Sequence, residues 1–133
     1  MDTSGNVATL RAAIEAFNRR DGDCFDDLLA EDAQIVPARA ALDGTVYRGP
    51  DAATQYCAAV DAIWEGLMFE SDDIRDGGDW VVALGRMRGR ARSSGALLEV
   101  TAGWVAHFRD GLVTSFHTHA DRAKALEAVG IRS

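Results

Sequence analysis

The chain has 133 residues, of which 47% are hydrophobic, and its formal net charge at pH 7 is −7. This length and composition predict one folded domain, residues 1–133, with a hydrophobic core of its own. The negative charge argues against nucleic acid and anionic membrane surfaces as partners, because both attract basic proteins.

Two features of the sequence predict the compartment. No apolar run approaches the ~18 residues of a membrane span, and the first residues lack the basic and apolar parts of a signal peptide. We therefore expect a cytoplasmic protein with no membrane partner. Cys24 and Cys57 are then expected to stay reduced.

The first half of the chain is mainly helical by pattern. Hydrophobic residues recur at helical spacing at Val7, Leu10, Ile14 and Phe17, and again at Ala53, Tyr56, Cys57, Val60, Ile63, Trp64 and Leu67. These stripes predict two amphipathic helices. A short helix over residues 24–30 and a short strand over residues 33–36 are expected between them. We expect a loop over residues 38–49, with a short edge strand near residues 45–48.

The second half predicts strands. After a strand over residues 68–75, three runs with strand character follow, at residues 80–92, 96–108 and 112–119. Glycine-containing turns separate them, which is typical of an antiparallel meander. Glycines within the runs, such as Gly85 and Gly103, are positions where a strand can bend. Asp121 is the expected N-cap of a closing helix.

This order of elements predicts an α+β fold, with the helices on one face of an antiparallel sheet. Strands this long bend and coil, because sheets twist. The concave face then leaves a space beneath the helices, which is the expected ligand pocket.

Short stretches along nearly the whole chain carry a family resemblance. They are FNRRD at residues 17–21, LLAEDA at 28–33, YRGP at 47–50, FRDGLV at 108–113 and DRAKALEAVG at 121–130. With these pieces in this order, the chain resembles the nuclear transport factor 2-like superfamily, in its SnoaL-like branch. The resemblance implies a cone-shaped barrel of a strongly bent antiparallel sheet, with N-terminal helices packed on its concave face around an apolar pocket. It also implies a homodimer formed through the outer sheet face.

Members of this superfamily include polyketide cyclases, isomerases, hydrolases, dehydratases and proteins that only bind. The general base of ketosteroid isomerase-like members corresponds here to Val36, and their oxyanion-binding tyrosine to Ala13. An aspartate of epoxide hydrolase-like members corresponds to Thr118. Neither mechanism is therefore complete in this sequence, and fold alone does not decide among the others.

The candidate catalytic residues are Asp121, His117 and His119. Asp121 is the carboxylate next to the last strand, and the two histidines share one face of that strand because side chains alternate. Histidine exchanges protons near neutral pH, so these residues suit general acid/base catalysis if their face lines the pocket. If the opposite face lines it, the histidines lie outside. No metal is expected, since a third ligand is not evident.

Arg86, Arg88, Arg90 and Arg92 alternate along one run. This basic face predicts either an anion site or a surface that pairs with the many acidic residues of the chain. The sequence leaves both open.

Residues expected to shape the pocket are Tyr47, Tyr56, Trp64, Trp104, Phe116 and Thr118. Three functions remain open. The chain is a cofactor-independent SnoaL-like cyclase, isomerase or hydrolase that acts on an apolar compound, a protein that binds a small apolar ligand without catalysis, or a dimerising interaction module with a closed interior.

Overall fold

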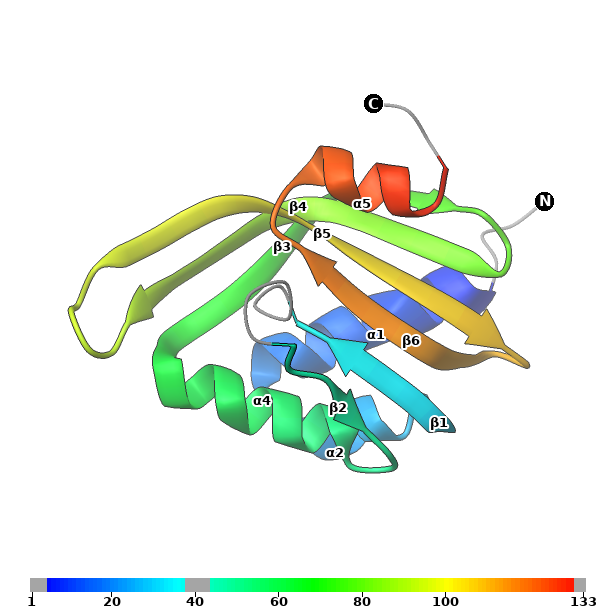
Figure 1. Cartoon of the computed structure of the whole chain (residues 1–133), viewed down its shortest axis with the longest axis horizontal. Coiled ribbons are helices and arrows are strands. Elements are labelled where there is room, and N and C mark those ends of the chain that lie inside the picture. The colour runs from blue at the N-terminus through cyan, green and yellow to red at the C-terminus, as the bar shows by residue number, and fades with distance from the viewer. Residues whose placement is uncertain (1–4, 38–43, 131–133) are drawn as a thin grey trace.

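The computed structural model describes residues 5–37 and 44–130. Figure 1 shows the elements of this part of the chain. In chain order they are α1 (Gly5–Arg19), α2 (Gly22–Asp26), β1 (Leu29–Val36), β2 (Tyr47–Arg48), α4 (Ala52–Ile63), β3 (Trp64–Asp76), β4 (Trp80–Ala91), β5 (Leu97–Arg109), β6 (Leu112–His119) and α5 (Arg122–Ala128). The predicted α+β class is confirmed.

The strands form one mixed sheet in the order β2-β1-β6-β5-β4-β3. The expected meander is present, because β3, β4, β5 and β6 pair antiparallel with their neighbours. The sheet is not wholly antiparallel, since β1 pairs parallel with β6. Tight turns reverse the chain between neighbouring strands of the meander, whereas β1 is connected to β6 through α4 and the four strands β2, β3, β4 and β5. Among the described strands β2 and β3 lie at the two edges, so the sheet is open rather than a closed barrel.

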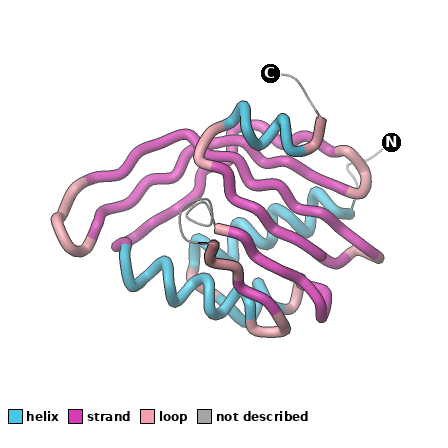
Figure 2. Tube along the Cα trace, in the orientation of Figure 1, coloured by secondary structure: helices cyan, strands magenta, loops and turns pink. Residues whose placement is uncertain are grey.

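The helices divide between the two faces of the sheet. In Figure 2, α1, α2 and α4 lie on one side, and α5 lies on the other. The main core is on the side of the three N-terminal helices and centres on Trp104, whose ring stacks on Phe69 at 4.5 Å and meets Phe17 edge-on at 5.0 Å. This is the concave face that the sequence predicts.

A smaller core lies on the outer face beneath α5. Ala125 and Leu126 of this helix pack on Val82, Leu84 and Val105. The N-cap prediction is confirmed, because the Asp121 carboxylate accepts a hydrogen bond of 3.0 Å from the Lys124 N–H. A Cβ at Gly103 would overlap Ala125, so glycine at this position lets the helix approach the sheet.

Two predicted boundaries are wrong. The second long helix was expected to reach Leu67, but α4 ends at Ile63, and Trp64 has the extended φ of −120°. Trp64 pairs with Ala91, so sheet pairing overrides the helical spacing of the side chains. Similarly, the short helix expected over residues 24–30 ends at Asp26, because Leu29 already pairs with β6.

The end of α1 fixes the edge strand β3. The Asn18 side chain donates to the Phe69 carbonyl at 3.0 Å and accepts from the Phe69 N–H at 2.9 Å. Arg20 donates to the Leu67 carbonyl and forms an ion pair of 2.7 Å with Asp61 of α4. These contacts hold α1, α4 and β3 together at one end of the molecule.

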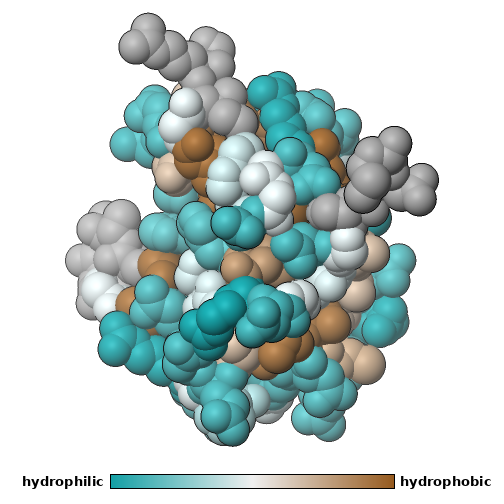
Figure 3. Space-filling view, turned by 90° about the vertical axis from the view of Figure 1, so that its right-hand side faces the viewer, coloured by the Kyte–Doolittle hydropathy of each residue, from teal (hydrophilic) through white to brown (hydrophobic). Residues whose placement is uncertain are grey.

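The surface seen in Figure 3 is mostly hydrophilic, with apolar side chains in small separate areas. No helix within residues 5–37 and 44–130 is both long enough and apolar enough to cross a membrane.

Candidate functional site

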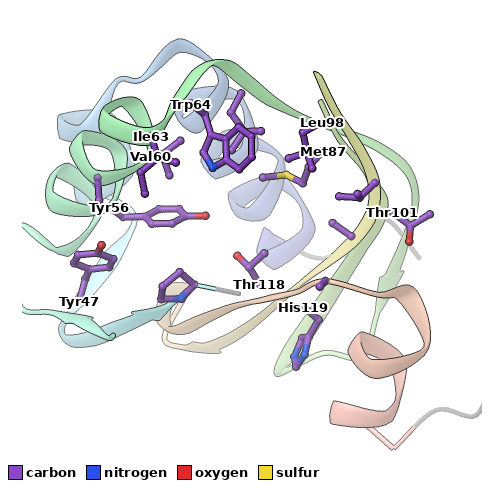
Figure 4. Close-up of a pocket in the computed structure, with 16 residues that line it drawn as sticks. Tyr47, Tyr56, Val60, Ile63, Trp64, Met87, Leu98, Thr101, Thr118 and His119 are labelled. Atoms are coloured by element: carbon purple, nitrogen blue, oxygen red, sulfur yellow. The ribbon is translucent and has the colours of Figure 1, made fainter. Parts of the chain in front are cut away.

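A cavity of about 260 Å³ opens between α4 and the concave face of the sheet. Figure 4 shows α4 on one side of it and strands of the sheet on the other. The lining residues are Pro37, Tyr47, Tyr56, Ala59, Val60, Ile63, Trp64, Leu67, Met87, Leu98, Val100, Thr101, Ala102, Thr118, His119 and Ala120. This cavity lies on the side of the sheet where the sequence predicts a space beneath the helices.

The lining is almost entirely apolar. Among its described residues there is no Asp, Glu, Lys or Arg. The side-chain oxygens of Tyr56 and Thr118 point into the space, whereas the Thr101 side chain points away (Figure 4). The cavity thus offers neutral hydroxyl groups and hydrocarbon surface, but no fixed charge.

Tyr56 is the buried phenol of this site. It lies on α4, with 4% of its surface exposed, and its ring stacks on Phe17 at 5.5 Å between centroids. Burial raises the pKa of its hydroxyl to about 12, and the nearby Thr118 hydroxyl offsets part of this rise. Tyr56 therefore stays a neutral hydrogen-bonding group at physiological pH.

Thr118 settles which face of β6 turns inward. Its side chain, 5% exposed, points into the cavity, and Phe116 on the same face is fully buried in the main core. The Thr118 oxygen is close enough to Tyr56 to influence its pKa, yet it makes no hydrogen bond of normal geometry with any described residue. It is a buried polar atom that interacts with the Tyr56 side chain without forming a hydrogen bond of normal geometry.

The candidate acid/base residues lie outside the cavity or at its border. His117 and His119 alternate with Thr118, so they occupy the outer face of β6, where their rings stack at 4.2 Å between centroids. His119 borders the cavity, but its ring points away from it (Figure 4). The pKa of His117 is lowered mainly by burial and to a smaller extent by the charge of His107. The pKa of His119 is lowered mainly by burial and to a smaller extent by the charge of His117. Asp121 caps α5, and neither Asp121 nor His117 lines the cavity.

The family model described as "SnoaL-like domain" matches residues 10–116. The chain belongs to the SnoaL-like family. No curated protein matches it.

Solved structures share the fold of this SnoaL-like chain. An NTF2-like protein of unknown function from Burkholderia pseudomallei is 24% identical, with a TM-score of 0.79 over 96% of this chain and 99% of that one. A Catenulispora acidiphila protein with a ketosteroid isomerase-like fold, in complex with trimethylamine, is 18% identical, with a TM-score of 0.76 over 92% of both chains. TerC, co-crystallized with polyporic acid, is 20% identical, with a TM-score of 0.76 over 93% of this chain and 97% of that one.

Four of the six residues expected to shape the pocket of this SnoaL-like domain line the cavity, namely Tyr47, Tyr56, Trp64 and Thr118. Trp104 and Phe116 do not; they lie in the core, with their rings 4.6 Å apart. The aliphatic part of the lining, including Val60, Leu67 and Met87, was not expected from the sequence. Their helical and alternating spacing marks a buried face, but it does not separate core from cavity.

The arginine face of β4 is ion-paired. Arg88 contacts Glu70 at 2.9 Å and Glu99 at 3.1 Å, and Arg86 lies 3.7 Å from Glu99. Arg90 donates instead to the Gly95 carbonyl at 2.7 Å. Of the two open alternatives, this geometry favours a charged surface that pairs with acidic residues over an anion site.

Within the part of the chain that the structure describes, no three His, Cys, Asp or Glu side chains are grouped so that they could hold a metal ion.

Proposed function

We propose that this SnoaL-like protein binds a small, uncharged, mostly apolar molecule in the cavity between α4 and the sheet, without a cofactor. The observation that carries this proposal is the lining, in which no described residue is an Asp, Glu, Lys or Arg. A charged ligand would lose its hydration there without gaining an opposite charge. A neutral ring compound would replace water against aliphatic and aromatic walls at no such cost.

The size of the space supports a ligand of one or two rings. An apolar cavity of about 150 Å³ is large enough for benzene, and the space here is about 260 Å³. Trp64, Tyr47 and Tyr56 offer aromatic surface for ring contacts. The same fold holds small organic molecules elsewhere, polyporic acid in TerC and trimethylamine in the Catenulispora protein.

Tetralin, a bicyclic hydrocarbon, tests the proposal by isothermal titration calorimetry. We expect saturable binding to the native chain. Ala59→Phe, which fills the cavity from α4, should abolish it, whereas Ala58→Phe on the exposed side of the same helix should not. Absence of binding to the native chain, or equal effects of the two variants, would contradict the proposal.

A second candidate is acid/base catalysis on the same class of molecule. Membership of the SnoaL-like family favours it, as does the position of His119 at the border of the cavity. In this proposal Asp121, His117 and His119 exchange protons with the substrate. A turnover screen with Asp121→Asn and His117→Ala tests it, and unchanged rates would remove those residues from the mechanism. The third alternative, an interaction module with a closed interior, is disfavoured by the open cavity.

Pairing into a homodimer through the outer sheet face also remains a proposal. Met68 and Leu97 on that face are 44% and 75% exposed. Light scattering coupled to size-exclusion chromatography distinguishes a dimer from a monomer, and a monomer at high protein concentration would oppose it.

A further inference from the structure

Thr118 stands out among the buried polar groups of the described chain. Its hydroxyl is buried, points into the cavity and has no hydrogen-bond partner of normal geometry. Buried hydroxyl groups are nearly always hydrogen-bonded in folded proteins, because an unmade bond costs free energy. An open cavity that faces such a group leaves room for a ligand atom to supply the missing bond.

Tyr56 provides a second hydroxyl at the same place. Figure 4 shows its phenol oxygen and the Thr118 oxygen turned toward each other from opposite walls, one on α4 and one on β6. The Tyr56 ring is held by its stack on Phe17 at 5.5 Å and by Tyr47 at 6.0 Å. The phenol position is therefore fixed before any ligand enters.

We propose that Thr118 and Tyr56 form a hydroxyl pair that binds a carbonyl oxygen of a neutral ring compound. This inference rests on the proposed function and names the chemical class of its ligand. A carbonyl oxygen has two lone pairs and can accept from both hydroxyls, whereas a hydrocarbon of the same shape offers neither hydroxyl an acceptor. The pair also discriminates against carboxylates, because two neutral hydroxyls do not replace the hydration of an anion.

The test compares two probes with nearly the same bicyclic skeleton, 1-tetralone, which is a ketone, and tetralin, which lacks the oxygen. Dissociation constants are measured by calorimetry for the native chain, Thr118→Val, Tyr56→Phe and Thr118→Ser. Thr101→Val is the matched control, since its side chain points away from the cavity (Figure 4). The readout is the ratio of the two dissociation constants in each variant, compared with the same ratio in the native chain. The ratio cancels changes in protein stability, and the comparison cancels the difference in hydration between the two probes.

We expect Thr118→Val to weaken the binding of 1-tetralone about tenfold, which corresponds to the loss of one hydrogen bond of about 1.4 kcal/mol. The dissociation constant of tetralin should change less than about twofold in the same variant. Tyr56→Phe should act in the same direction, whereas Thr118→Ser and Thr101→Val should preserve the native ratio.

Three outcomes would overturn the inference. Tetralin binding with a ratio unchanged in both Thr118→Val and Tyr56→Phe would refute the hydroxyl pair and leave the proposed function standing. An equal shift in Thr101→Val would show that the ratio does not report on the cavity. Failure of both probes to bind the native chain would remove the proposed function as well.

Discussion

The contact between Asn18 and Phe69 predicts a specific loss of stability in Asn18→Ala. The Asn18 amide makes hydrogen bonds of 3.0 and 2.9 Å with the carbonyl and the N–H of Phe69. Phe69 lies on the edge strand β3, and its ring stacks on Trp104 at the centre of the core. Truncation to alanine leaves both backbone groups without their protein partner.

The two bonds have a net worth of about 1 kcal/mol each, and more where the backbone groups are shielded from water. Replacing Asn by Ala in a helix returns up to about 0.7 kcal/mol through its higher helix propensity. We therefore expect a net loss of about 1–2 kcal/mol in the free energy of unfolding. For a chain of this length, this corresponds to a fall in Tm of roughly 4–8 °C.

Urea unfolding followed by tryptophan fluorescence measures the loss as a lower midpoint at an unchanged m-value. Asn6→Ala is the matched control, because Asn6 lies on the same helix and makes one exposed bond, of 2.7 Å, to the Gly78 carbonyl. It should cost less than about 0.5 kcal/mol. An equal loss of stability in Asn18→Ala and Asn6→Ala would refute the claim that the two hydrogen bonds to Phe69 stabilise the fold.

Three further outcomes are expected. Asp26→Ala should lower stability by about 1–2 kcal/mol in thermal unfolding, because the Asp26 carboxylate caps α4 by accepting from its first N–H groups. Gly103→Ala should destabilise the chain and increase hydrogen exchange in α5, since the added methyl overlaps Ala125. The lowered pKa values of His117 and His119 mean that the unfolded chain binds more protons below about pH 6.5, so stability should fall on acidification through that range. The double variant His117→Gln/His119→Gln should show a smaller loss between pH 7 and pH 5 in urea unfolding.

Each of these expectations has a contrary result. A loss in the exposed Asp27→Ala equal to that in Asp26→Ala would argue against capping of α4. Unchanged exchange in α5 would show that the helix tolerates a larger residue at Gly103. An identical pH dependence in the double variant would mean that the outer-face histidines do not couple protonation to folding.

The sequence was most informative where the chemistry is local. Glycine turns and strand-forming residues marked the meander of β4, β5 and β6, and Asp121 marked the start of α5. The apolar stripe of α1 predicted a buried face, and all four of its marked positions are buried. These features depend on residues close together in the chain, so their pattern determines the local structure.

By itself, then, the sequence determined the α+β class, the antiparallel meander, the resemblance to the SnoaL-like branch and part of the cavity lining. Only the tertiary structure decided the parallel pairing of β1 with β6, the end of α4 before Trp64 and the inward face of β6. Alternation along a strand separates Thr118 from His117 and His119, but it does not say which set meets the helices. That choice depends on contacts between segments far apart in the chain, and it left a neutral hydroxyl, rather than an imidazole, facing the cavity.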